Sequence, residues 1–304
     1  MRRRAKVPNT RPGGPGGGDV TIGVGHRWKP GWLRGANSEL IAFFVLAYAL
    51  SWSWAIPLAV THRIIRQGQA WPTHYPALLG PAVAAFAVTA WTGGRAGVRD
   101  LVARMTRWRV PLRWWLVALS PIGFLAIGLA ATWAAGHRLP AVDDFARFSG
   151  TPAIGLIGVA VLITFVGALG EETGWRGFAL PRLQRRFGPL AATLILAPLW
   201  FLWHLPQFFV IATYRDFGPA SYVGMFLGLT AGAVVLTWLY NRSGGSVLLV
   251  IVWHGVYNIV GGTAAAAGTL AAVISVLITV QGIALIAADV TTRHRGHPSI
   301  LGPE

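Results

Sequence analysis

Eight long apolar segments, separated by short basic connections, are the feature that most constrains the fold of this chain. Each is roughly 20 residues long, the length that a helix needs to cross about 30 Å of hydrocarbon. Because lipid offers no hydrogen-bond partners, a spanning helix must satisfy its own backbone. We therefore predict an all-α, polytopic transmembrane helical bundle of about eight spanning helices. The predicted spans are Ser38–Val60, Pro76–Trp91, Trp115–Ala135, Ala153–Leu180, Ala192–Ala212, Tyr222–Tyr240, Ser246–Gly262 and Thr269–Asp289.

The composition favours a membrane protein and excludes several other classes. Of the 304 residues 54% are hydrophobic and only 12% are charged, whereas soluble domains carry about 25% charged residues. The net charge of +16 does not indicate a nucleic-acid partner, because the basic residues occupy the gaps between apolar segments. The chain has no cysteine, so disulfides and thiolate metal sites are excluded.

The basic residues also predict domains and topology. Residues 1–36 are basic and rich in Gly and Pro, which predicts a disordered cytoplasmic tail. Residues 37–291 form the predicted transmembrane domain, and residues 292–304 a short cytoplasmic tail. Apart from Arg176, which we place within the membrane, 20 Lys and Arg residues lie on the side of the termini and five on the other. The positive-inside rule then predicts a multi-pass plasma-membrane protein with both termini in the cytoplasm and an even number of spans.

The connection with the most arginines follows the second predicted span. In this connection Leu101, Met105 and Trp108 fall on one helical face, and most of the arginines lie off it. This pattern is typical of an interfacial helix that rests on the anionic headgroups of the lipid bilayer. An ordinary basic loop explains most of the same residues.

Two acidic residues interrupt a predicted span. Glu171 and Glu172 lie well inside an apolar segment, whereas Glu39 and Asp289 lie at helix ends, where the interface can hydrate them. A charge at the centre of a membrane helix costs about 2.5 to 3.5 kcal/mol on insertion scales. Intramembrane carboxylates are therefore candidate functional groups.

Other polar residues in the spans complete a candidate site. Of the eight histidines, we predict that only His204 and His254 lie within the membrane, and Asn258 follows His254 by one helical turn. Residues four apart share a helical face. Arg176 likewise follows Glu172 by four residues and can keep its carboxylate ionised. We expect these side chains to form one site.

Two kinds of hydrolytic chemistry suit these residues. Glu171, His204 and His254 match the ligands of some catalytic zinc sites, in which a second carboxylate accepts the proton of the bound water. In a metal-free version Glu171 activates water that His204 orients, and His254 with Asn258 stabilises the oxyanion. The sequence leaves both versions open.

Three motifs resemble those of the CPBP intramembrane protease family, which includes type II CAAX prenyl endopeptidases and bacterial Abi and bacteriocin-immunity proteins. The stretch "EETGWRGF" resembles the motif EExxxR, "WFLWH" resembles FxxxH, and "HGVYN" resembles HxxxN. They follow one another in family order over residues 150–262, with Trp200 in place of the Phe of the second motif. The catalytic residues that the resemblance implies are Glu171, Glu172, Arg176, His204, His254 and Asn258.

The resemblance implies an intramembrane endopeptidase with a glutamate-activated water, held by a divalent metal such as zinc bound to Glu171, His204 and His254. The expected partner is a peptide or protein substrate in or at the membrane, reached from the cytoplasm. Two other functions use the same residues: a transporter or proton relay, and a non-catalytic immunity or sorting protein. No HExxH, membrane GxSG or second intramembrane aspartate supports another protease class.

Overall fold

The structure, a computed structural model, describes residues 36–303, and within this range it contains helices and no strand. The predicted all-α fold is confirmed. Except for Ala36, the predicted tail 1–36 lies outside the described residues. The elements are α1 (Ala36–Val60), α2 (Tyr75–Leu78), α3 (Gly80–Met105), α4 (Leu112–Ala118), α5 (Ser120–Ala134), η2 (Val142–Ala146), α6 (Gly155–Leu162), η3 (Ile163–Ala168), α7 (Leu169–Gly174), η4 (Trp175–Ala179), α8 (Leu180–Phe187), α9 (Pro189–Trp203), α10 (Gln207–Val210), α11 (Ala212–Arg215), α12 (Pro219–Arg242), α13 (Val247–Gly262) and α14 (Gly268–His294).

All eight predicted spans are largely helical, but the span Ala192–Ala212 is interrupted by a turn at residues 204–206, between α9 and α10. Not all of the spans are long enough to cross a membrane. Between residues 36 and 303, six helices pass by length and composition, and α4 with α5, bent by 45°, makes a seventh if the pair is one span. Helix α13 has 16 residues, or about 24 Å at 1.5 Å per residue. The predicted even number of spans therefore depends on counting α13. The six helices are Ser38–Val60, Tyr75–Met105, Gly155–Phe187, Pro189–Val210, Pro219–Arg242 and Gly268–His294.

Helix α3 joins the second predicted span to the predicted interfacial helix. The two parts meet at Gly94, whose φ of 58° lies in the left-handed region that favours glycine. Beyond the break, Val102 and Trp108 are exposed, but Leu101 is buried in the protein. The apolar face of this segment is thus shared between the protein core and the outer surface.

Glycines allow α7 to approach its neighbours closely. A Cβ atom at Gly170 would lie 2.5 Å from the Leu78 carbonyl oxygen, and one at Gly174 would lie 2.4 Å from Pro81 Cβ. Small residues four apart are a common device for close helix packing in membranes. The two glutamates lie between these glycines, so their position is fixed against α2 and α3.

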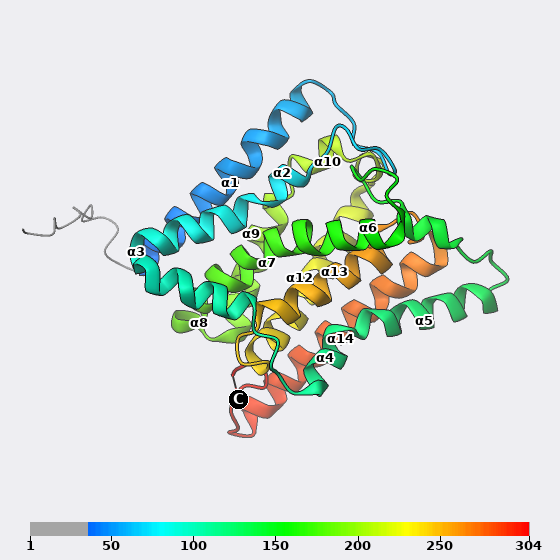
Figure 1. Cartoon of the computed structure of the whole chain (residues 1–304). Coiled ribbons are helices and arrows are strands. Elements are labelled where there is room, and N and C mark those ends of the chain that lie inside the picture. Colours follow the sequence, from blue (N-terminus) through cyan, green and yellow to red (C-terminus); the bar gives the residue numbers. More distant parts are fainter. Residues whose placement is uncertain (1–35, 304) are drawn as a thin grey trace, which may run out of the picture. The chain divides into compact units, whose positions relative to one another are not determined.

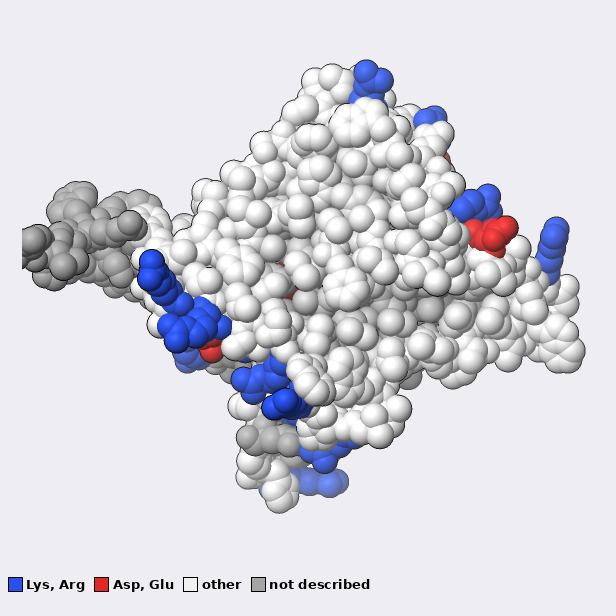
Figure 2. Space-filling model, viewed as in Figure 1, with Lys and Arg blue, Asp and Glu red and all other residues white. Residues whose placement is uncertain are grey.

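Helix α7 runs through the middle of the bundle, with α3 and α13 packed against it and α9 against the following η4 (Figure 1). Figure 2 shows that the charged side chains of one face gather at opposite borders of an uncharged band. Exposed arginines of α3 and the loop after it lie at one border, and those of the loops after α1 and α5 at the other. This separation agrees with the count of basic residues, while the cytoplasmic assignment stays a prediction.

One expectation about the helix ends is wrong. Asp289 is fully buried in α14, instead of being hydrated at the interface. Its Oδ1 accepts hydrogen bonds from the Ser299 hydroxyl at 2.5 Å and from Leu301 N–H at 3.3 Å. The Leu301 carbonyl oxygen also accepts a hydrogen bond from Asn241 Nδ2 at 2.6 Å. The chain after α14 therefore folds back onto α12 and α14, and its contacts enclose the carboxylate.

Candidate active site

Two π turns flank the short helix that carries the glutamates. Helix α7 lies between η3 and η4, and the three form one continuous helical segment. π turns within helices are frequent at functional sites. The carbonyl oxygen of Gly177 in η4 accepts a hydrogen bond of 2.7 Å from Nη1 of Arg104 in α3. Nothing in the sequence motif predicts these turns.

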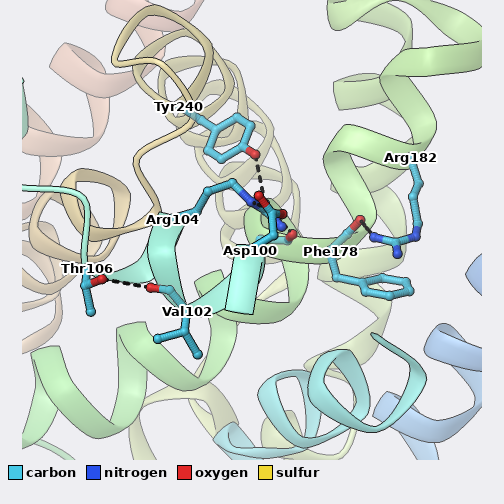
Figure 3. A network of polar contacts seen from close by, with 8 residues as sticks. Asp100, Val102, Arg104, Thr106, Phe178, Arg182 and Tyr240 are labelled. Carbon is cyan, nitrogen blue, oxygen red and sulfur yellow. Dashed lines mark hydrogen bonds and ion pairs between the residues drawn. The ribbon is translucent and has the colours of Figure 1, made fainter. Parts of the chain in front are cut away.

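Arg104 connects this segment to two further helices (Figure 3). Its Nη1 also donates a hydrogen bond to the Tyr240 hydroxyl oxygen of α12 at 3.0 Å, and its Nε lies 3.0 Å from Asp100 Oδ2. The guanidinium of Arg182 lies 3.5 Å from the centroid of the Phe178 ring. Side chains from outside the motif thus hold the C-terminal end of the motif segment.

Glu172 is the centre of a buried ion-pair cluster. Nη1 of Arg176 donates to both of its oxygens, at 2.8 Å to Oε1 and 3.0 Å to Oε2. His254 Nδ1 of α13 lies 2.7 Å from the same Oε1. The pairing of Glu172 with Arg176 that the spacing predicts is confirmed, and His254 joins it from another helix.

Glu171 makes its contact with α9. Its Oε2 accepts a hydrogen bond of 2.7 Å from Nε1 of Trp200. The face of the same indole lies against Arg176, whose Cζ is 4.3 Å from the ring centroid. The ring of His254 meets the indole at 5.6 Å in an edge-to-face arrangement. Trp200 therefore contacts four of the predicted site residues, since His204 lies against it as well. The sequence indicates only an aromatic at its position.

Hydrogen bonding determines how the two histidines present their rings. His204 Nδ1 lies 2.8 Å from the carbonyl oxygen of Trp200, and since a carbonyl oxygen only accepts, Nδ1 carries a proton. By the same reasoning His254 Nδ1 donates to the carboxylate of Glu172. Each Nε2 atom is therefore left for a water, a substrate or a metal.

Exposure divides the cluster into two layers. Glu172 and Arg176 are 0% exposed, whereas Glu171, His204 and His254 keep 5%, 8% and 7% of their surface. The first pair cannot meet a substrate in this arrangement. The other three are also buried but keep a small accessible surface. We therefore treat them as the outer layer, which is suited to chemistry, and Glu172 with Arg176 as the inner layer that holds it.

Asn258 is the least connected of the predicted residues. It lies one turn after His254 on α13 and is half-buried. Among residues 36–303 its side chain has no hydrogen-bond partner, while the other five predicted residues are linked directly or through Trp200. Its amide is available to a ligand, but no contact fixes its direction.

The predicted metal ligands do not form a ready metal site. Within residues 36–303, no group of three or more His, Cys, Asp or Glu side chains is placed so that it could hold a metal ion. The free Nε2 atoms of His204 and His254 are suitable donors, and Glu171 has one oxygen bonded to Trp200 and one free, but the three groups are not placed around one position. We therefore derive no catalytic step through a metal, and zinc stays a prediction.

A third histidine near the site escaped the sequence analysis. His74 precedes α2 in a connection outside the apolar spans, yet it is buried and stacks on Tyr75 with ring centroids 5.0 Å apart. Burial, together with the charge of His204, lowers its pKa to about 4. Its Nδ1 atom has no hydrogen-bond partner in the described part of the chain. The only available signal was its position in a connection between two predicted spans.

Comparison with known proteins finds a family model that matches the motif-bearing segment. Residues 152–260, little more than a third of the chain, match the model of the family described as Type II CAAX prenyl endopeptidase Rce1-like. This segment is similar to that family. The resemblance predicted from the three motifs is thereby confirmed, and the match includes all six predicted site residues.

A curated relative supports the same assignment. The "CAAX prenyl protease 2" of Methanococcus maripaludis is 31% identical over 118 residues, which are 37% of this chain and 44% of the relative. The chain thus matches less than half the length of that protein. The likeness covers part of each chain, and the activity of the whole protein is a separate question.

Proposed function

We propose that this protein is an intramembrane endopeptidase that hydrolyses a peptide bond of a substrate held in or at the membrane. The observation that carries the proposal is the two-layer cluster. Glu171, His204 and His254 are partly open beside the sealed pair of Glu172 and Arg176. The Rce1-like segment that contains this cluster adds support.

In the proposed mechanism Glu171 is the general base. A water molecule lies between its carboxylate and His204, whose bare Nε2 accepts a hydrogen bond from the water and orients it. As the water oxygen attacks the carbonyl carbon of the scissile bond, one water proton passes to Glu171. The same proton then goes to the leaving amine when the C–N bond breaks, so the carboxylate is restored.

His254 and Asn258 are the proposed donors to the oxyanion. Because Nδ1 of His254 donates to Glu172, its Nε2 can donate only when the ring carries a second proton. Glu172 favours that imidazolium by its negative charge, and Arg176 keeps Glu172 in place. The half-buried amide of Asn258 supplies the second donor once a substrate is bound.

The test is peptide cleavage by the purified full-length protein in detergent, with quenched fluorescent peptides offered with and without a prenyl group. Glu171→Gln keeps the shape and the contact with Trp200 but cannot act as a base. We expect it and His204→Ala to lower kcat by roughly 10²- to 10⁴-fold. Asp143→Asn, which changes an exposed carboxylate in η2, is the control and should keep its activity. Near-normal turnover of Glu171→Gln would contradict the mechanism.

The role of a metal is tested separately. Metal chemistry at the two free Nε2 atoms requires a neutral His254, whereas oxyanion donation requires it protonated. If a metal takes part, chelator abolishes cleavage, added zinc restores it, and His254→Ala loses bound metal. If the protein is instead fully active when elemental analysis finds no transition metal in it, that result would exclude the metal mechanism and support water activation by Glu171.

A further inference from the structure

Trp200 is the side chain that joins the two layers of the cluster. Its N–H holds one oxygen of Glu171 at 2.7 Å, and its ring covers the guanidinium of Arg176 at 4.3 Å. Arg176 needs this cover, because its Nε and Nη2 are buried and have no hydrogen-bond partner among residues 36–303. A cation over the face of an indole is stabilised by the ring electrons, most strongly where water is excluded.

The contact with Glu171 has a direct consequence for the proposed chemistry. A carboxylate has two oxygens and can rotate, so a base that must meet one water needs one oxygen fixed. The indole N–H fixes Oε2, and Oε1 has no hydrogen-bond partner in the described part of the chain. Oε1 is thus the oxygen left for the water.

We propose that Trp200 is a positioning residue, which orients Glu171 so that its free oxygen meets the water. This inference rests on the proposed function. The second motif of the family has Phe at this position, and Phe has no N–H to donate. The hydrogen bond is therefore a feature that this chain adds to the motif, and Trp200→Phe should fold, since it introduces the residue that the motif itself contains.

The first measurement needs no activity. In infrared spectra of the protein, the carboxyl band of Glu171 is identified by the difference between the wild type and Glu171→Gln. Loss of a hydrogen bond of 2.7 Å should shift that band in Trp200→Phe. Trp175→Phe is the matched control, because Trp175 is also buried and its Nε1 has no hydrogen-bond partner within residues 36–303. It should leave the band in place, and an unshifted band in Trp200→Phe would overturn the proposal.

The second measurement separates positioning from packing. Trp200→Phe should lower kcat about 10- to 100-fold, the range expected for a hydrogen bond to a charged group, with KM unchanged. Trp175→Phe should stay within about threefold of the wild type. In Glu171→Asp the carboxylate is withdrawn from the indole by one methylene group, so adding Trp200→Phe should cost less than about threefold.

The outcomes distinguish this inference from the proposed function. If the wild type cleaves no peptide, the proposed function fails and the infrared result still decides the role of Trp200. If the wild type is active, Glu171→Gln is inactive and Trp200→Phe keeps its kcat, only the role of Trp200 is overturned. The role of Trp200 would also be overturned if Trp200→Phe lowered kcat equally in the wild type and in Glu171→Asp. The indole would then act through something other than the carboxylate of Glu171.

Discussion

Two regions of the bundle contain a fully buried carboxylate with an arginine one helical turn later. In the motif segment Glu172 lies 2.8 Å from Arg176, and in α14 Asp289 lies 3.0 Å from Arg293. Both carboxylates are 0% exposed. The local pattern is therefore the same, and any difference in use must come from what surrounds each pair.

The surroundings differ in what they leave available. Glu172 shares its Oε1 with His254, whose Nε2 faces away from the pair. Oδ1 of Asp289 accepts hydrogen bonds from the Ser299 hydroxyl and the Leu301 N–H, which belong to the end of the chain after α14. A buried carboxylate–arginine pair is therefore not by itself the mark of a site. In the motif segment the pair has a neighbour, His254, whose second ring nitrogen is left for a ligand beside Glu171 and His204.

The largest expected effect separates the two arginines. The Arg176 side chain is 0% exposed and that of Arg293 is 49% exposed. Removing one partner of a buried pair typically costs about 3 to 5 kcal/mol, because the other charge stays buried alone. We expect Arg176→Met to lower the free energy of unfolding by that amount. Arg293→Met also leaves a buried carboxylate, but Asp289 keeps its hydrogen bonds from Ser299 and Leu301. Because water already screens the exposed Arg293, we expect a smaller loss of about 1 kcal/mol.

Denaturant titration in detergent measures both variants side by side. The ring of Trp200 over Arg176 and the free space around Arg293 make methionine acceptable at both positions, since it keeps much of the aliphatic stem. Equal losses in the two variants would break the comparison, and would mean that the exposure of the arginine does not decide the strength of the pair.

The sequence predicts the residues of the site better than their contacts. Spacing alone places Arg176 on the face of Glu172, and periodicity places His254 and Asn258 on one face. The hydrogen bond between Trp200 and Glu171 joins residues 29 apart in the chain, so it depends on how α9 packs on α7. The burial of His74 depends in the same way on tertiary packing. Hydropathy patterns along the sequence do not predict such tertiary contacts.

The fold shows the same limit. Apolar length predicts where helices form, because each segment must satisfy its own backbone in lipid. It does not show that α3 continues past Gly94 into the basic connection, or that Asp289 is enclosed by the chain that follows α14. In each case the outcome is decided by contacts between elements, and a window along the sequence cannot contain them.

The next effect sharpens the comparison with a buried ionisable group, His74, whose Nδ1 has no hydrogen-bond partner among residues 36–303. Burial, then the charge of His204, lowers the pKa of His74 from 6.5 to about 4. The unfolded chain therefore binds a proton between these pH values while the folded protein does not. Stability is complete above about pH 6.5 and falls as the pH drops to about 4, by up to about 3 kcal/mol.

Thermal unfolding from pH 7.5 to pH 4 measures this loss. His74→Phe can keep the stacking on Tyr75 and cannot take up a proton, so its unfolding temperature should fall less steeply than that of the wild type. Every other histidine is the same in both proteins, so the difference between the two curves reports proton uptake by His74 together with its coupling to His204. Parallel curves would contradict the buried neutral state of His74.

The smallest expected effect tests the other side of the comparison, the pair that holds the chain end. Asp289→Asn keeps an oxygen acceptor for Ser299 and Leu301 but removes the charge that strengthens both bonds. We expect a local loss of about 1 kcal/mol, which corresponds to several-fold faster amide exchange over residues 299–302. Hydrogen exchange with mass spectrometry measures this change, and Glu39→Gln serves as the control.

Because no free donor or acceptor of the Asp289 cluster faces the site, peptide cleavage by Asp289→Asn should stay within about twofold of the wild type. A loss of cleavage without faster exchange would mean that Asp289, like Glu172, supports the chemistry, and the distinction between the two pairs would fail.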